Sequence, residues 1–362
     1  MRNASFAAFL VALAIAAPAR AEAPYFPTAE EWRTATPEEA GLDAAAVDAA
    51  LDVAAKNNST GVLIVRHGKI VAERYWRGWD AKRSEPIFSS SKSIVSTLIG
   101  MAIEDGFIEG VEQSASDFIT DWKGTDKEAI TIRHLLSMTS GLESSGGQVR
   151  ANEGSIFLST VARPLVSKPG EKWVYNTPAY RLLANILEIA TGEKIEAYMA
   201  RRLSSPIGLA DTHWVTQTAP DGATNYYFIR QTPRDMARFG LLALHWGNWA
   251  GEQLVSAAWL HEATTPSQEL NASYGYLWWL NGQSFFLPPA VRAKRVDRMM
   301  WPDCPSDMFA ALGAADKKIY VVPSLDLVVV RHGEAVDKAD PGAAGSSFDA
   351  EFVGRLCKAA AP

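Results

Sequence analysis

The predicted strands of this 362-residue chain lie near its two ends, and helical patterns fill the long middle. Residues 61–66 and 69–75 are rich in Val and Ile and are joined by a tight His67-Gly68 turn. Toward the other end, strands are predicted at 274–281, 308–313, 318–323 and 325–332. We therefore expect an α+β fold, in which an antiparallel sheet built from both chain ends is flanked by helices and carries an inserted, mostly helical domain.

The middle of the chain shows apolar residues at helical spacing, with few strand signals. The predicted helices of this part span 90–104, 132–138, 180–191, 195–203 and 234–244. Two further helices are expected near the chain ends, at 43–55 and 348–359. The domain prediction follows: residues 22–105 and 225–362 form a discontinuous domain that carries the sheet, residues 106–224 form the helical domain, and a cleft lies where they meet.

Residues 1–21 have the features of a secretory signal peptide. Arg2 begins the segment, an apolar stretch covers 7–17, and Ala19-Arg20-Ala21 forms a small-x-small cleavage site. The stretch is shorter than the roughly 20 residues that cross a bilayer, so we expect cleavage and a periplasmic or secreted protein without stable membrane insertion. Cleavage would remove two arginines and change the net charge from -6 to -8, which is unfavourable for binding nucleic acid.

The cysteines and histidines of the chain suggest no metal site. An oxidising compartment would allow Cys304 and Cys357 to pair, and we expect a disulfide, with two buried thiols as the alternative. The six histidines follow no H-x-x-H or H-E-x-x-H spacing, and we expect neither a metal nor a cofactor. No pattern in the chain specifies an oligomeric state.

Ser89 and Lys92 form an S-x-x-K pair at the start of the predicted helix 90–104. Residues three apart share a helix face, so the amine can reach the hydroxyl. Unpaired N–H groups at the helix start favour a developing anion, and a desolvated lysine loses proton affinity and can act as a base. Because the spacing alone occurs by chance about once in such a chain, Ser89 could instead be an ordinary N-cap, and the other motifs must decide.

The segments that follow Ser89 form an ordered set, 132–142, 169–177, 232–240, 274–279 and the strand pair around Gly313. This set resembles the class C β-lactamase-like superfamily, which includes β-lactamases, D-alanyl-D-alanine peptidases, carboxylesterases and 6-aminohexanoate-dimer hydrolases. The segments 87–100 and 319–323, with the Trp278-Trp279 pair, are similar to the nylon-oligomer hydrolase and esterase branch. No G-x-S-x-G elbow occurs in the chain.

The resemblance implies roles for several residues. Ser89 is the acylated nucleophile and Lys92 its proton acceptor. Tyr175 matches the tyrosine of the family's Y-x-N motif and relays protons, and we expect the adjacent Lys92 ammonium to lower its pKa. The alternative for Tyr175 is a buried structural phenol. The backbone N–H groups of Ser89 and Ala314 would form the oxyanion hole.

Two positions depart from the family pattern. Thr177 replaces the last residue of Y-x-N, and its hydroxyl lacks the combined donor and acceptor of an amide. Ala311-Leu312-Gly313 replaces Lys-Thr-Gly, so the cation that helps to hold a substrate carboxylate in β-lactamases and peptidases is missing. We therefore expect small-molecule esters or linear amides as substrates, rather than penicillins, with Thr177 and Gly313 among the substrate-binding residues.

The Trp278-Trp279 pair supplies two more candidate substrate contacts. Successive residues of a strand point to opposite faces, so at most one of these indoles lines the cleft and the other packs in the core. The favoured function is that of a serine hydrolase that forms an acyl-enzyme on Ser89. The alternatives are a β-lactamase or D-alanyl-D-alanine carboxypeptidase, and a non-catalytic ligand-binding or sensing protein, which Thr177 and Ala311 would suit.

Overall fold

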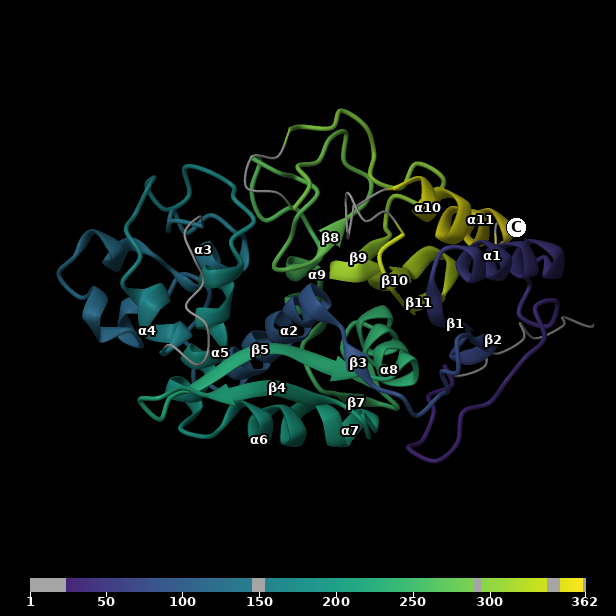
Figure 1. Ribbon diagram of the computed structural model, residues 1–362, viewed down its shortest axis with the longest axis horizontal. Helices are drawn as coiled ribbons and strands as arrows, with labels where there is room; N and C mark the ends of the chain where they lie inside the picture. Colours follow the sequence, from purple (N-terminus) through teal and green to yellow (C-terminus); the bar gives the residue numbers. More distant parts are fainter. Residues whose placement is uncertain (1–23, 145–153, 290–293, 337–345, 361–362) are drawn as a thin grey trace, which may run out of the picture.

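The computed structural model describes residues 24–144, 154–289, 294–336 and 346–360. Its largest feature is a six-stranded antiparallel sheet (Figure 1). Its order is β2-β1-β11-β10-β9-β8. The strands are β1 (Ser59–Arg66), β2 (Lys69–Tyr75), β8 (Trp279–Leu280), β9 (Phe309–Gly313), β10 (Lys317–Val322) and β11 (Leu327–Gly333). β1 pairs with β11, with Leu63 opposite Val330. The predicted α+β fold, with a sheet built from both chain ends, is confirmed. The predicted signal peptide lies outside the described residues.

Helices cover both faces of this sheet. One face carries α1 (Ala44–Lys56) and the C-terminal α10 (Ser347–Asp349) and α11 (Arg355–Ala359), while α8 (Pro233–Leu244) packs on the other (Figure 1). β1, β10 and β11 are buried along almost their whole length. Cover on both faces explains why these strands carry runs of Val and Ile in place of a strict alternation with polar residues.

The helix α2 (Ser91–Glu104) runs through the centre of the molecule. It is buried continuously from Ser91 to Ala102 and contacts β9, α5 (Thr177–Thr191) and α9 (Ala257–Ala263). A helix enclosed on all sides is normally apolar all round, yet this one buries a lysine and several hydroxyl groups at its start. Those polar residues therefore have to find partners inside the protein.

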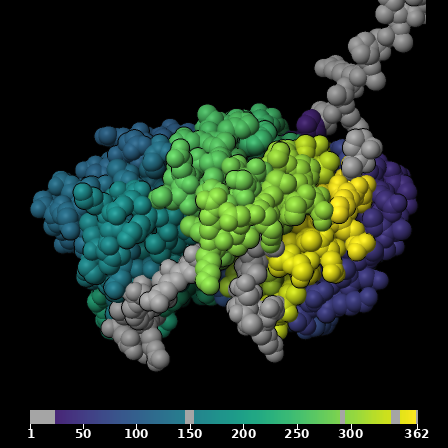
Figure 2. Space-filling model, turned by 90° about the horizontal axis from the view of Figure 1, so that it is seen from above, coloured from purple at the N-terminus to yellow at the C-terminus, as the bar shows by residue number. Residues whose placement is uncertain are grey.

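The remaining helices and a small second sheet surround α2 on the side away from the chain ends. The helices are α3 (Ile132–Leu136), α4 (Ile156–Val161), α5, α6 (Ile195–Met199) and α7 (Ser205–Ile207). The strands of the second sheet are β3 (Glu85–Pro86), β4 (His213–Thr218) and β5 (Thr224–Gln231). A separate pair, β6 (Asn248–Trp249) and β7 (Glu252–Gln253), follows later in the chain. Figure 2 shows the N-terminal (purple) and C-terminal (yellow) parts of the described chain side by side, at the end of the molecule opposite to these helices.

The β4–β5 hairpin corrects the expectation of few strands in the middle of the chain. The burial of β5 does not alternate cleanly, because its residues face α5 on one side and the turn before α2 on the other. The pattern on which strand prediction depends was therefore weak. The predicted domain boundary between 224 and 225 falls at the start of β5, next to its hairpin partner β4, and the division into domains stays a prediction.

The two cysteines do not form the expected disulfide. Cys304 and Cys357 are both buried free thiols. A hydrogen bond with Cys357 is the main cause that raises the pKa of the Cys304 thiol, and burial adds to it. The two thiols are neighbours inside the protein, and the alternative of two buried thiols describes them.

Two features of the described residues concern membranes and metals. No helix formed by residues 24–144, 154–289, 294–336 or 346–360 is long and apolar enough to cross a bilayer. Within the same ranges, no three His, Cys, Asp or Glu side chains are grouped so that they could hold a metal ion.

Candidate active site

Ser89 lies in a 3-10 turn, Phe88–Ser90, that leads directly into α2. The turn is anchored by Ile87, whose N–H donates to the Ile229 carbonyl of β5 at 2.9 Å. Phe88 has a φ of 47°, in the left-handed region, which costs a non-glycine residue about 1 kcal/mol or more. Ser89 is partly exposed, whereas Ser90 is fully buried. A strained backbone thus presents the Ser89 hydroxyl at the start of a buried helix.

Lys92 contacts this hydroxyl from one helical turn further on. Its Nζ atom lies 3.0 Å from Ser89 Oγ and 3.5 Å from Thr177 Oγ1, and both contacts are hydrogen bonds. The amine lies over the rings of Tyr175 and Tyr180, 5.0 Å and 4.2 Å from their centres. The structure therefore brings together Ser89, Lys92, Tyr175 and Thr177, four of the residues predicted for the site.

The protonation state of Lys92 follows from its surroundings. The residue is 2% exposed, and burial is the main cause that lowers its pKa well below the usual value. The positive charge of Arg181 lowers the pKa further. Burial thus favours the neutral amine, whose lone pair can accept the proton of Ser89.

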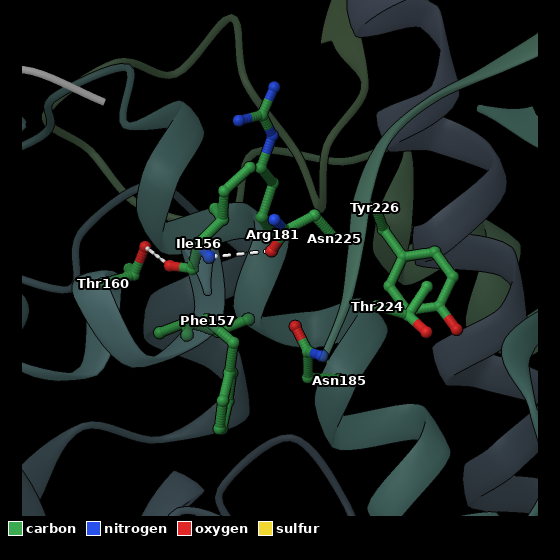
Figure 3. A pocket seen from close by; sticks show the side chains of 9 residues that line it. Ile156, Phe157, Thr160, Arg181, Asn185, Thr224, Asn225 and Tyr226 are labelled. Atoms are coloured by element: carbon green, nitrogen blue, oxygen red, sulfur yellow. Dashed lines mark hydrogen bonds between the residues drawn. The ribbon is translucent and has the colours of Figure 1, made fainter. Parts of the chain in front are cut away.

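Arg181 was not among the predicted site residues. It lies on α5, four residues after Thr177, and therefore on the same helix face. Its guanidinium lies 5.5 Å from the centre of the Tyr227 ring, and in Figure 3 it points away from Asn185 and Phe157. The hollow that Arg181, Asn185 and Phe157 help to line has a volume of about 10 Å³, room for at most one water. Arg181 acts on Lys92 through its charge.

Tyr175 forms a hydrogen bond with Ser89 through its phenol. Burial raises the pKa of Tyr175 to about 12, and the bond to Ser89 opposes this shift. The sequence-based expectation of a lowered pKa is wrong, because burial of the phenol raises its pKa and outweighs the contacts that lower it. Tyr175 is consequently a neutral phenol that can donate and pass a proton but is not a phenolate base.

Asn176 explains why Tyr175 and Thr177 face Lys92. It caps α5, its Oδ1 accepting from the Ala179 N–H at 3.1 Å and its Nδ2 donating to the Leu142 carbonyl at 2.8 Å. The helix therefore begins at Thr177, three residues before the predicted start. An asparagine cap followed by a proline in the first turn is a recognisable signal for this start, which would also have placed Arg181 near the site.

The two indoles of the Trp278-Trp279 pair face opposite ways, as expected. Trp279 stacks on Tyr175 with ring centres 5.9 Å apart, while Trp278 packs between Phe239 and Phe309. Both are almost fully buried, at 0% and 2% exposure for Trp278 and Trp279. Trp278 therefore packs in the core and Trp279 supports the ring of Tyr175, and their role as substrate contacts stays a prediction.

The predicted strand 274–281 is also shorter than expected. Only Trp279–Leu280 forms a strand, because the preceding residues turn back, with the Gly275 N–H donating to the Trp278 carbonyl at 2.9 Å. Leu277 has a φ of 63°, a conformation that no strand residue adopts.

Gly313 brings the end of β9 against the turn that carries Ser89. A Cβ atom at Gly313 would lie 2.2 Å from the Ile87 carbonyl oxygen and 3.0 Å from Ser90 Oγ, so the approach requires glycine. Ala314 follows at once and is exposed. This proximity is compatible with an oxyanion hole made by the N–H groups of Ser89 and Ala314, which stays a prediction.

Gly313→Ala should separate β9 from this turn, because the new methyl group collides with backbone atoms that cannot rotate away. We expect the rate of Ser89 labelling by a fluorophosphonate to fall by about 100-fold or more, measured by mass spectrometry of the adduct. Ala310→Gly, a change of one methyl group on the same strand, serves as the control and should stay within about threefold of the unmodified protein. Equal labelling rates for both variants would contradict the steric argument.

Comparison with known proteins agrees with this geometry. The Beta-lactamase family profile matches residues 44–341. An uncharacterized protein of Alkalihalophilus pseudofirmus is 25% identical over 76% of this chain and 83% of its own length, and the 6-aminohexanoate-dimer hydrolase of Paenarthrobacter ureafaciens is 25% identical over 67% and 72%. A β-lactamase structure from Mycobacterium bovis shares the fold, with a TM-score of 0.61, 18% identity and coverage of 86% and 100%. The chain belongs to the Beta-lactamase family, whose members are serine hydrolases.

Proposed function

We propose that this protein hydrolyses small-molecule esters or linear amides through an acyl-enzyme on Ser89. The observation that carries the proposal is the 3.0 Å contact between Ser89 Oγ and the Lys92 amine, whose pKa burial lowers well below its usual value. A hydroxyl is a weak nucleophile by itself and needs an adjacent base. The contact supplies that base, and family membership supplies the class of reaction.

Acylation begins when Ser89 Oγ attacks the substrate carbonyl carbon and its proton passes to Lys92 Nζ. The carbonyl oxygen gains negative charge and is held by the backbone N–H groups of Ser89 and Ala314. The positive end of the α2 dipole, at which Ser89 lies, adds to this stabilisation. Donors fixed in the backbone need no reorganisation during the reaction, which is why they are effective.

Tyr175 then carries the proton to the leaving group. Its phenol is hydrogen-bonded to Ser89 and its ring lies under the Lys92 amine, so it can give its proton to the departing alkoxide or amine and regain one from the Lys92 ammonium. Thr177 holds that amine in place at 3.5 Å. Water next attacks the acyl-enzyme along the reverse path, and Ser89 is regenerated.

The surroundings of Ser89 favour neutral substrates. Ala311, where related enzymes carry a cation, has a buried methyl group. Phe88 packs edge-on against Phe228 at 5.2 Å beside the nucleophile, and the Tyr175 ring lies on the Lys92 side. Aromatic walls and the uncharged side chain of Ala311 suit an uncharged acyl group.

Ser89→Ala tests the nucleophile. The substitution removes the only atom to which the acyl group can bond in this mechanism, so p-nitrophenyl butyrate hydrolysis should fall by about 1,000-fold or more and the fluorophosphonate adduct should disappear. Ser96→Ala is the control, because Ser96 is a fully buried serine on α2, the helix that carries Lys92, and its activity should stay within about twofold. Undiminished activity in Ser89→Ala, or an adduct on another residue, would contradict the proposal.

Arg181→Gln tests the charge that acts on Lys92. Lys92 must be neutral to accept a proton, so kcat/KM rises with pH as Lys92 loses its proton. Removing the positive charge of Arg181 raises the pKa of Lys92, and this acidic limb of the profile should move to higher pH, with the plateau at higher pH unchanged. Arg181→Lys keeps the charge and should leave the limb in place. A shift to lower pH, or equal shifts in both variants, would show that the charge does not act this way.

A substrate panel on one preparation tests the predicted preference. Because Ala311 carries no charge, a β-lactam carboxylate lacks the charged partner that related enzymes supply at this position. We expect kcat/KM for p-nitrophenyl butyrate to exceed that for nitrocefin by about 100-fold or more, with Ser89→Ala as the blank. Comparable values for the two substrates would favour the β-lactamase alternative.

A further inference from the structure

Three serines at the start of α2 take no part in the proposed proton transfers. Ser90, Ser91 and Ser93 are 0%, 0% and 1% exposed. Burying a hydroxyl group is unfavourable unless it is hydrogen-bonded, and each of these serines bonds to a different part of the chain. They therefore connect the helix that carries Ser89 and Lys92 to three separate walls of the site.

Ser91 and Ser93 bond to parts of the chain that supply no proposed oxyanion donor. Ser91 Oγ accepts from the Ile229 N–H of β5 at 2.9 Å. Ser93 Oγ donates to the Leu277 carbonyl at 2.8 Å, in the segment that leads to the Trp279 indole. Neither hydroxyl bonds to the β9–β10 hairpin.

Ser90 bonds to that hairpin on both of its strands. Its Oγ lies 3.0 Å from the Lys317 carbonyl of β10 and 3.3 Å from the Ala311 carbonyl of β9. Lys317 pairs with Gly313 across the hairpin, so the two carbonyls flank the turn that begins at Ala314. The buried Ser90 hydroxyl thus joins the turn that carries Ser89 to both strands of the hairpin, next to Ala314.

The hairpin turn needs such a restraint because its backbone is strained. Ala315 and Asp316 have φ values of 58° and 55°, and two consecutive non-glycine residues in the left-handed region are unfavourable. On the side away from Ser89, Arg331 donates to the Asp316 carbonyl at 2.8 Å and Lys318 pairs with the Asp316 carboxylate at 3.1 Å. Ser90 supplies the corresponding contact on the side of the nucleophile.

We propose that Ser90 is a positioning residue that sets the spacing between the backbone N–H groups of Ser89 and Ala314. It acts through its hydrogen bonds to Ala311 and Lys317, and it touches neither the substrate nor the transferred proton. Gly313 makes the close approach possible, and the Ser90 hydroxyl holds it. The inference rests on the proposed acyl-enzyme chemistry, since it concerns the oxyanion hole of that reaction.

Ser91→Ala provides a matched control. It removes an equally buried, hydrogen-bonded hydroxyl from the same helical turn, next to Lys92, and leaves the hairpin contacts intact. A loss of activity caused only by weaker packing of α2 would appear in both variants. A loss caused by a displaced Ala314 N–H would appear in Ser90→Ala alone.

The experiment compares Ser90→Ala, Ser91→Ala and the unmodified protein by ester kinetics, fluorophosphonate inactivation and urea unfolding. We expect Ser90→Ala to lower kcat and the inactivation rate constant by about 10- to 100-fold, with KM within about threefold. The acidic limb of its pH profile should not move, because Lys92 keeps its surroundings. Ser91→Ala should lower kcat by no more than about threefold. The urea midpoint of unfolding should change by a similar amount in Ser90→Ala and in Ser91→Ala.

Equal losses of kcat in both serine variants, or a loss in Ser90→Ala confined to KM, would overturn the positioning role. Ser90→Cys covers the case in which Ser90→Ala does not fold, because a thiol is of similar size but a weak donor. We expect it to lose at least about fivefold in kcat, and unchanged kcat would overturn the role as well. An unmodified protein that neither hydrolyses esters nor labels at Ser89 would contradict the proposed function itself, whereas an active protein unaffected at Ser90 contradicts only this inference.

Discussion

The burial of the Lys92 amine is the constraint on which the rest of the site depends. A charged ammonium inside the protein is costly, so burial lowers the pKa of the amine and favours its neutral form. Its neighbours agree with that state: the hydroxyls of Ser89 and Thr177 bond to it, two aromatic rings cover it, and Arg181 adds a repelling charge. Burial also raises the pKa of Tyr175, to about 12, so both groups favour their neutral forms.

The site assembles where three distant parts of the chain meet at the start of α2. Ser89 and Lys92, the proposed nucleophile and base, come from the first third of the sequence. Tyr175 and Thr177 come from the start of α5, and Gly313 and Ala314 from the β9–β10 hairpin. The hairpin can approach because Gly313 has no side chain, and buried serine hydroxyls join α2 to its surroundings. A sheet shared by both chain ends brings the hairpin to the helix.

Several errors of sequence-based prediction have a common cause. The β4–β5 hairpin was missed and the strand around Trp278 was overextended because burial there depends on neighbours far away in the chain. The expected disulfide failed for a related reason, since the partners of a side chain are a property of the folded chain. The start of α5 was different: Asn176 and the proline that follows contained a local signal that could have been used.

The sequence by itself determined the elements whose causes are local. The runs of Val and Ile specify the strands of the sheet, and the three-residue spacing of Ser89 and Lys92 places both on one helix face. Only the tertiary structure decided the protonation state of Lys92 and Tyr175, the need for glycine at Gly313 and the partners of Ser90. These depend on desolvation and on distances between segments more than 80 residues apart in the chain, such as the 85 residues between Lys92 and Thr177. Periodicity along the sequence carries no information about such distances.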